Sequence, residues 1–577
     1  MQSVDFTTLA AVCAELKASW LPARVEQVYQ LDRYTVALYL RTLDRKGWLH
    51  LSWHPRAARF HIGDAPPKIP DTFTFSDQLR HQLNGYALIG LEFVAPWERV
   101  IDLQFAKRPD DPATWHLFVE VMGKYSNVIL TNGDRGIVTV AHQVNSAQSS
   151  VRTVQTGQMY ELPPVLSGTS PALTESIERW RERVSLIPKN VEKALISTYR
   201  GVSPQLARSI LVKAGIPAET TTEQLTETDW KNLFQTWREW LTILETGSFS
   251  PGWTADGGYT VLGWGAVEPA DNAQVLLNRY YSDRLRKETF QQLHQKLSQK
   301  IHNLLAKLQV KAEGFEKRLQ ESEEAEIYRY RADLLMANLH EIRQGMKSID
   351  LPDFETGKPV AIDLDPERTP VQNAQFFYKQ HQKRKRARLA VEPLLAEVTG
   401  EIDYLEQVRS SLASLPTYTD PEDLQTLEEI QEELIQEKYL EENNAKNRAI
   451  IKESEPIRYI TPSGFEIWIG RNNRQNDRLT FRSATDYDLW FHSQEIAGSH
   501  VLLRLPPGSS AEEVDLQFAA DHAAYYSRAA GSEQVPVVYT RPKHVYKPRG
   551  AKPGMVVYKQ ETVIWGKPGR VEDYRKK

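Results

Sequence analysis

The chain has 577 residues, 41% hydrophobic and 25% charged, and its net charge of -4 excludes a uniformly basic nucleic-acid-binding coat. A chain of this length suits roughly three to five domains of about 150 residues each. The single cysteine, Cys13, excludes an internal disulfide and a cysteine-based metal site, and indicates a reducing, cytoplasmic location. The first residues lack the basic region of a signal peptide, and no run of 18 apolar residues predicts a membrane span.

In much of residues 1–170, apolar and polar residues alternate as they do in half-buried strands. An amphipathic helix is predicted after Asp5, and a short helix ends at Gly85. The predicted strands are VEQVYQL, YTVALYLRT, WLHLSW, ARFHIG, VIDLQF, WHLFVEVM and NVILTN. Asn132-Gly133 marks a hairpin turn. Since strands follow strands with few helices between them, we predict a β-rich α+β module.

Residues 171–275 form a helical region, in which residues 190–216 have the pattern of a helix-hairpin-helix. One helix is predicted to end at Gly201, and the next begins with Ser203 as its cap and Pro204 in its first turn. Such a turn offers backbone N–H groups to a phosphate. A plain αα-hairpin explains the same pattern.

Residues 276–450 predict a long antiparallel coiled-coil arm. Apolar residues fall near a/d spacing up to about Ile349, among them Leu297, Ile301, Leu304, Leu308 and Phe315. A small hairpin is predicted at residues 350–370, and two further helical runs return the chain. About 45 to 65 helical residues would reach roughly 70 to 100 Å, which suits a spacer or lever.

Residues 455–577 predict a second α+β module. We predict a hairpin about Pro462-Ser463-Gly464 and the strands DLWFH and SHVLLRL. An amphipathic helix at residues 511–530 follows them. The last stretch, from Arg541, is rich in lysine and arginine and forms a local positive field.

The known catalytic motifs are absent from the sequence, including GxxxxGK[ST], HExxH and GxSxG. His492 and His500 can be metal ligands across a loop or, more commonly, ordinary polar residues. We therefore expect a binding protein, not an enzyme, without a metal or cofactor.

Two basic stretches are candidate RNA-binding segments. In the first, Lys379, Lys383, Arg384, Lys385, Arg386 and Arg388 follow the aromatic residues Phe376, Phe377 and Tyr378. The second contains Lys543, Lys547, Arg549 and Lys552. Basic side chains neutralise phosphates and aromatic rings stack on bases. A solvated coiled-coil face and a solvated terminal strand are the respective alternatives.

Several stretches together resemble the NFACT family, which includes the RqcH-type and NEMF ribosome quality control factors. The N-terminal module is matched by VDFTTLAAVCAELK and VEVMGKYSNVIL, and the helix-hairpin-helix by GVSPQLA. The middle module is matched by AIDLDPERTPVQNAQFFYKQHQKRKRA. The C-terminal NFACT-R module is matched by IGRNNRQNDRLTFRSATDYDLWFHSQEIAGSHVLLR and KHVYKPRGAKPGMVVY. The resemblance covers nearly the whole chain.

The resemblance implies a factor that binds obstructed large (50S) ribosomal subunits carrying peptidyl-tRNA. Such factors contact rRNA and recruit tRNA, alanyl-tRNA in bacteria, for template-free alanine tailing of the stalled chain. The ribosome supplies the peptide-bond chemistry, and a small RNA-binding protein of the RqcP type is an expected partner.

Glu98 and Arg99 precede the predicted strand VIDLQF, and Pro96 places them at its entrance. This pattern alone favours a structural salt bridge, whereas the resemblance implies a tRNA-binding site. The Asp-Arg pair that the family needs for tRNA recruitment matches Glu98-Arg99, and an N-terminal helix aspartate matches Asp5. The arginine fork suits phosphates and base edges. Glu98 differs from the family's aspartate by one methylene, which puts its geometry in question.

Two other functions remain open from the sequence. Some relatives are named as fibronectin/fibrinogen-binding proteins, which suggests a surface adhesin. The N-terminal and helix-hairpin-helix pairing also resembles formamidopyrimidine-type DNA glycosylases in fold, but Met1-Gln2-Ser3 lacks their proline-glutamate start.

Overall fold

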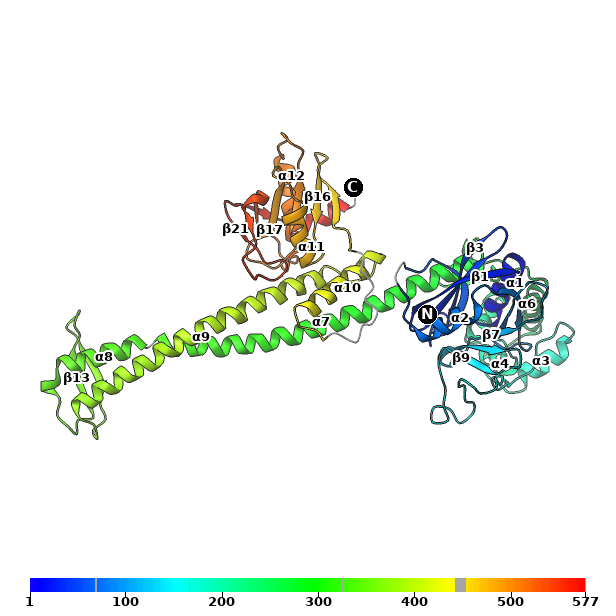
Figure 1. Cartoon of the computed structure of the whole chain (residues 1–577), viewed down its shortest axis with the longest axis horizontal. Helices are drawn as coiled ribbons and strands as arrows, with labels where there is room; N and C mark the ends of the chain where they lie inside the picture. Colours follow the sequence, from blue (N-terminus) through cyan, green and yellow to red (C-terminus); the bar gives the residue numbers. More distant parts are fainter. Residues whose placement is uncertain (68–69, 166, 324, 442–452, 576–577) are drawn as a thin grey trace. The chain divides into compact units, whose positions relative to one another are not determined.

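The computed structural model describes residues 1–67, 70–165, 167–323, 325–441 and 453–575 (Figure 1). They divide into two compact units, residues 1–286 and residues 287–441 with 453–575. None of the helices in these ranges is long and apolar enough to cross a bilayer. The multidomain mixture of helices and antiparallel sheets agrees with the predicted fold class.

The first unit is built on an antiparallel sheet in the order β4-β3-β2-β1-β5-β6-β7-β8-β9. Its strands are β1 (Ala23–Asp32), β2 (Thr35–Arg41), β3 (Lys46–Ser52), β4 (Arg59–Gly63), β5 (Ala87–Phe93), β6 (Val100–Ala106), β7 (Trp115–Glu120), β8 (Asn127–Asn132) and β9 (Ile137–Val140). The sequence predicts each of these strands except β5 and β9. The predicted turn at Asn132-Gly133 joins β8 to β9.

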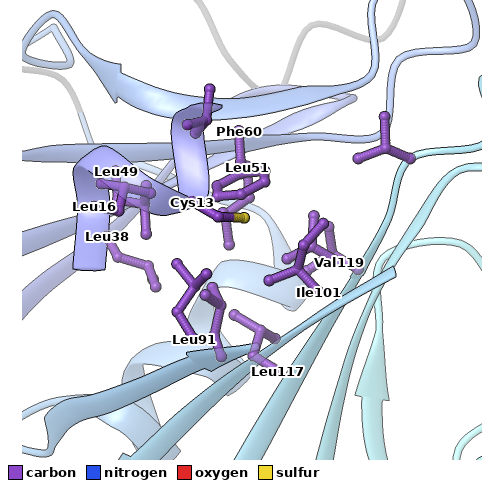
Figure 2. Packing of buried hydrophobic residues seen from close by; sticks show 14 of the residues in the cluster. Cys13, Leu16, Leu38, Leu49, Leu51, Phe60, Leu91, Ile101, Leu117 and Val119 are labelled. Atoms are coloured by element: carbon purple, nitrogen blue, oxygen red, sulfur yellow. The ribbon is translucent and has the colours of Figure 1, made fainter. Parts of the chain in front are cut away.

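The core of this sheet encloses α1 (Phe6–Trp20). Figure 2 shows Cys13 of α1 among apolar residues from both halves of the sheet, such as Leu51 of β3 and Leu117 of β7. Burial raises the pKa of the Cys13 thiol, so the thiol stays protonated. A second helix, α2 (Thr74–Leu83), packs on β1, and Gly85 follows it with a φ of 85°.

The helical region has a tryptophan-rich core that includes Trp180, Trp237 and Trp240. Its helices are α3 (Ile177–Ser185), α4 (Val191–Thr198), α5 (Pro204–Ala214) and α6 (Glu227–Thr246), followed by β10 (Gly252–Thr254), β11 (Tyr259–Thr260) and β12 (Ala266–Pro269). The two helices predicted within residues 190–216 are α4 and α5, and a turn at Gly201 joins them. Ser203 caps α5 by accepting a hydrogen bond from the Leu206 N–H at 3.0 Å, and Gly201 has a φ of 74°.

The first turns of α7 (Ala273–Glu323) belong to the first unit. Glu15 of α1 caps this helix, because its carboxylate accepts the Ala273 N–H at 2.7 Å and the Gln274 N–H at 3.3 Å. Leu276, Leu277, Tyr280 and Tyr281 are part of the same core as α1. The base of α7 is therefore an integral part of the first unit.

In the second unit, α7 and α9 (Pro370–Ala413) run side by side as the predicted antiparallel arm (Figure 1). Leu297 and Ile301 are fully buried in their seam against Tyr404 and Leu405. The arm is completed by α8 (Ala325–Ala337), β13 (Ser348–Pro352), β14 (Pro359–Asp363) and α10 (Pro421–Gln436).

The predicted extent of the first arm helix, to about Ile349, is wrong. The helix α8 ends at Ala337, and Ile349 lies in β13, which pairs with β14. The apolar spacing continues past Ala337 because Ile342 is buried in the cluster of the terminal hairpin without being helical. Gly345, with a φ of 91°, turns the chain there.

The C-terminal module has a sheet in the order β15-β16-β18-β17-β19-β22, and α12 (Glu513–Tyr525) covers one face. These strands are β15 (Ile457–Ile460), β16 (Glu466–Ile469), β17 (Leu489–Ser493), β18 (Val501–Arg504), β19 (Val535–Thr540) and β22 (Thr562–Gly566). Shorter elements are α11 (Asn473–Arg478), β20 (Val545–Tyr546), β21 (Val557–Tyr558) and α13 (Arg570–Arg575). The predicted hairpin is formed by β15 and β16, and Gly464 in its turn has a φ of 90°.

Polar contacts join this module to α10. Arg471 lies 3.3 Å from both Glu422 and Asp423, and the Asn473 side chain donates a hydrogen bond to Glu433 at 3.0 Å. Glu433 also accepts a hydrogen bond from the Tyr404 hydroxyl at 2.8 Å.

Candidate nucleic-acid interface

Asp5 joins the N-termini of two helices of the first unit. It caps α1, because its Oδ1 accepts hydrogen bonds from the Thr8 backbone N–H and the Thr8 hydroxyl, both at 2.8 Å. Its Oδ2 accepts the hydroxyl of Ser203, the cap of α5, at 2.7 Å. The side chain is buried. Both oxygens of Asp5 thus have partners within the chain, which suits a positioning role.

Glu98 and Arg99 occupy a tight turn immediately before β6. The Glu98 N–H donates to the Ala95 carbonyl at 3.3 Å, and the Val121 N–H donates to the Arg99 carbonyl at 2.9 Å. Trp97 has a φ of 65°, which is rare for a bulky residue and re-aims the chain before the strand begins. The pair therefore lies at the strand entrance, as predicted.

Trp97 is the residue that holds this turn against the rest of the site. Its ring lies 4.9 Å from the ring of Phe6 and 5.5 Å from that of Trp240. Its six-membered ring also lies directly over Gly201, where an added Cβ would come within 2.7 Å of Cε3. Phe6 and the turn at Gly201 therefore support Trp97, which immediately precedes Glu98 and Arg99.

The structure brings Asp5 and the Glu98-Arg99 pair together from segments far apart in the chain. Arg99 is half-buried, and burial lowers the pKa of its guanidinium, while the nearby carboxylates of Asp5 and Glu98 oppose that change. Glu98 is buried, with 8% of its surface exposed. Among the described residues, the Arg99 side chain makes no hydrogen bond or ion pair, so its N–H donors are open to solvent or to a ligand.

Ser203 and Trp97 complete the site, and the sequence identifies neither as part of it. Ser203 is recognisable as a helix cap, but its bond to Asp5 spans 198 positions. Trp97 sits beside the pair in sequence, although its left-handed backbone has no sequence signal.

The first basic stretch lies on α9. Lys383, Lys385 and Arg386 are exposed and form no ion pair within the described residues, whereas Arg384 stacks at 4.4 Å over Tyr328. The preceding aromatic residues serve the helix pair. Phe377 is buried, Tyr378 donates to Asp333 at 2.6 Å, and Arg368 lies 4.4 Å above the ring of Phe376.

The second basic stretch lies around β20 and β21 of the C-terminal module. Lys543 and Arg549 are exposed without an ion pair in the described ranges, and Lys547 pairs with Asp477. The Lys552 amine lies over the rings of Tyr439 and Tyr404, at 4.3 and 4.8 Å. Burial lowers the pKa of Lys552. Lys552 is therefore committed to the chain's own contacts.

His492 and His500 lie in the same module, with ring centres 5.3 Å apart. The His500 Nδ1 is hydrogen-bonded to the Thr480 hydroxyl at 2.7 Å. Burial lowers the pKa of His492 to about 4, so that ring is neutral at neutral pH. Within the described ranges, no three histidine, cysteine or acidic side chains are grouped so as to hold a metal ion.

Known protein families match both the N-terminal and the C-terminal part of the chain. A family model described as NFACT N-terminal and middle domains matches residues 5–453, and one described as NFACT protein RNA binding domain matches residues 456–560. The chain is 31% identical to the "Rqc2 homolog RqcH" of Bacillus subtilis, over 96% of each chain. It is also 31% identical to the protein of that name from Streptococcus suis, over 97% of each. Human "Ribosome quality control complex subunit NEMF" is 27% identical over 38% of this chain and 20% of its own.

Proposed function

The chain belongs to the NFACT family, and we propose that it is a ribosome quality control factor that binds obstructed large (50S) subunits carrying peptidyl-tRNA. Its similarity to the RqcH and NEMF proteins and its RNA-binding module support this role. In this role the protein acts in the cytoplasm and contacts rRNA, together with a small RNA-binding partner of the RqcP type.

The tRNA-binding site of this factor is formed by Asp5, Glu98 and Arg99. The observation that carries this assignment is the half-buried Arg99 guanidinium, which has no hydrogen-bond partner among the described residues yet lies near two carboxylates. An arginine in this state gains charge-assisted bonds when it meets a tRNA phosphate or base edge. The nearby carboxylates of Asp5 and Glu98 favour its charged form.

The remaining elements have distinct roles in this proposal. The arm carries its basic face along the subunit, and the first unit holds alanyl-tRNA. Alanine is added without a template, and the ribosome catalyses the peptide bond, so the protein itself is not an enzyme.

The subunit interaction is tested by sedimentation of the tagged protein from cells. We expect it in fractions of large subunits that carry peptidyl-tRNA, and sequencing of the co-purified RNA should recover rRNA and alanine tRNA. Recovery only in ribosome-free fractions would refute the role.

The tRNA site is tested by Arg99→Ala, with Arg99→Lys to separate charge from fork geometry. We expect Arg99→Ala to abolish tRNA co-purification while subunit binding persists, and Arg99→Lys to retain little tRNA. The control is Arg108→Ala, which changes an exposed arginine of the same unit. Loss of subunit binding and tRNA together in Arg99→Ala would show that Arg99 supports the fold instead.

A further inference from the structure

An open groove of about 540 Å³ lies on the C-terminal module. Three segments form it: the turn between β15 and β16, the loop that leads into β17, and the end of β18. The two candidate basic stretches do not line it.

The groove is walled by aromatic side chains. Trp468 of β16 is fixed between arginines of the two neighbouring strands, because the guanidinium of Arg458 lies 4.6 Å and that of Arg504 4.4 Å from its ring centre. Arg504 is itself held by Asp488 at 3.3 Å and the Ser483 carbonyl at 2.9 Å. The wall at Trp468 is thus preorganised.

Tyr487 forms a second wall and is 55% exposed. It makes no hydrogen bond or ring contact within the described part of the chain. Phe465, half-buried, also lines the groove. An exposed tyrosine next to a fixed tryptophan offers a flat surface for a ring that stacks.

A single exposed carboxylate gives the groove polarity. Glu466 Oε2 accepts the Trp468 indole N–H at 2.7 Å, and no described residue binds Oε1. A carboxylate oxygen accepts a hydrogen bond from an amino group, such as N4 of cytosine, and is repelled by an acceptor such as O4 of uracil.

The same face of the sheet also carries the basic segment. Trp468 packs against a cluster that contains Trp490, Leu502 and Val545. Val545 lies two positions after Lys543 in the second basic stretch. A polynucleotide whose phosphates meet Lys543 would thus lie on the face of the sheet that also carries Trp468.

We propose that this groove binds an unpaired RNA base, preferably one with an exocyclic amino group, which stacks on Tyr487 and donates to Glu466. The proposal rests on the proposed function, because it takes RNA as the ligand of the module matched by the RNA-binding family model. Aromatic walls, flanking arginines and one acceptor suit a base better than a peptide, whose backbone needs both donors and acceptors.

The test is RNA binding by the full chain, with labelled single-stranded cytidine and uridine oligoribonucleotides of about a dozen nucleotides as probes. We expect cytidine to bind more tightly than uridine, and Tyr487→Ala to weaken cytidine binding about tenfold. Glu466→Gln should remove the preference for cytidine, because an amide no longer excludes uridine. Tyr125→Ala, at a 71% exposed tyrosine of the first unit, should change neither affinity.

Photo-crosslinking gives a second readout, with cross-links expected at Tyr487 and Trp468. Unchanged affinity in Tyr487→Ala, or cross-links confined to residues 541–560, would overturn the proposal. So would binding of a proline-rich peptide that depends on Tyr487 while RNA binding does not. These outcomes leave sedimentation of the unmodified protein with large subunits intact, whereas failure of the proposed function would abolish that sedimentation.

Discussion

Gly201→Ala tests whether the contact between Gly201 and Trp97 positions Glu98 and Arg99. At a φ of 74°, any L-residue incurs about 1–2 kcal/mol of backbone strain. The new Cβ would also come within 2.7 Å of the Trp97 ring, where carbon atoms prefer about 3.5–4.0 Å, so the ring must move by roughly 1 Å. Forced repacking of this kind costs about 1–3 kcal/mol. We expect a total destabilisation of about 2–5 kcal/mol and a displaced Glu98-Arg99 turn.

The matched control is Gly215→Ala, since Gly215 has a φ of 76° but no atom within 4 Å of an added Cβ. It incurs the backbone strain alone. Denaturant unfolding followed by tryptophan fluorescence measures both variants, and tRNA co-purification reports on the site. We expect Gly201→Ala to lose tRNA and Gly215→Ala to retain it. Equal destabilisation by both variants, with equal tRNA retention, would refute the role of the Gly201–Trp97 contact.

Three further predictions concern the cap, the arm and its contact with the C-terminal module. Ser203→Ala removes the hydroxyl that donates to Asp5 and caps α5, and should lower the free energy of unfolding by about 1–3 kcal/mol, whereas Ser203→Thr should not; an unchanged denaturation midpoint would contradict this. Burial raises the pKa of Glu433 to about 7 from 4.5, so its contribution to stability is full below pH 4.5 and is lost as the pH rises through 7. Glu433→Gln should therefore stabilise the second unit at pH 8 by up to about 3 kcal/mol and flatten its pH dependence, and a pH profile that matches the unmodified protein would exclude Glu433 as the cause. Charge reversal of three arm residues should reduce the slope of the logarithm of the RNA-binding constant against the logarithm of the salt concentration by up to about 2–3. Reversal of three control lysines on α7 should leave this slope unchanged. The arm residues are Lys383, Lys385 and Arg386, and the controls are Lys296, Lys307 and Lys317; equal slopes in the two variants would place the RNA elsewhere.

Local patterns account for what the sequence predicts well. Gly201, Ser203 and Pro204 predict the end of one helix and the start of the next, because caps and turns depend on residues close in sequence. The arm follows from its heptad spacing. The strand β5 escapes prediction because its buried and exposed residues do not alternate, and Gly90 faces Gln104 so closely that a Cβ would come within 2.7 Å of the amide oxygen.

The site depends on contacts that no local pattern contains. The resemblance supplies Asp5, Glu98 and Arg99, but not their convergence. The Asp5–Ser203 bond and the Trp97–Gly201 contact each join residues about a hundred or more positions apart, and such contacts are decided by tertiary packing.

The capping of α7 by Glu15 determines where the N-terminal part can be cut from the rest of the chain. A fragment that stops at residue 275 would lose Leu276, Leu277 and Tyr281, each of them fully buried, and would expose the apolar surface of α1 that they cover. A fragment that extends to Arg286 keeps these side chains and the cap. An isolated first unit should therefore retain residues 273–286 of α7.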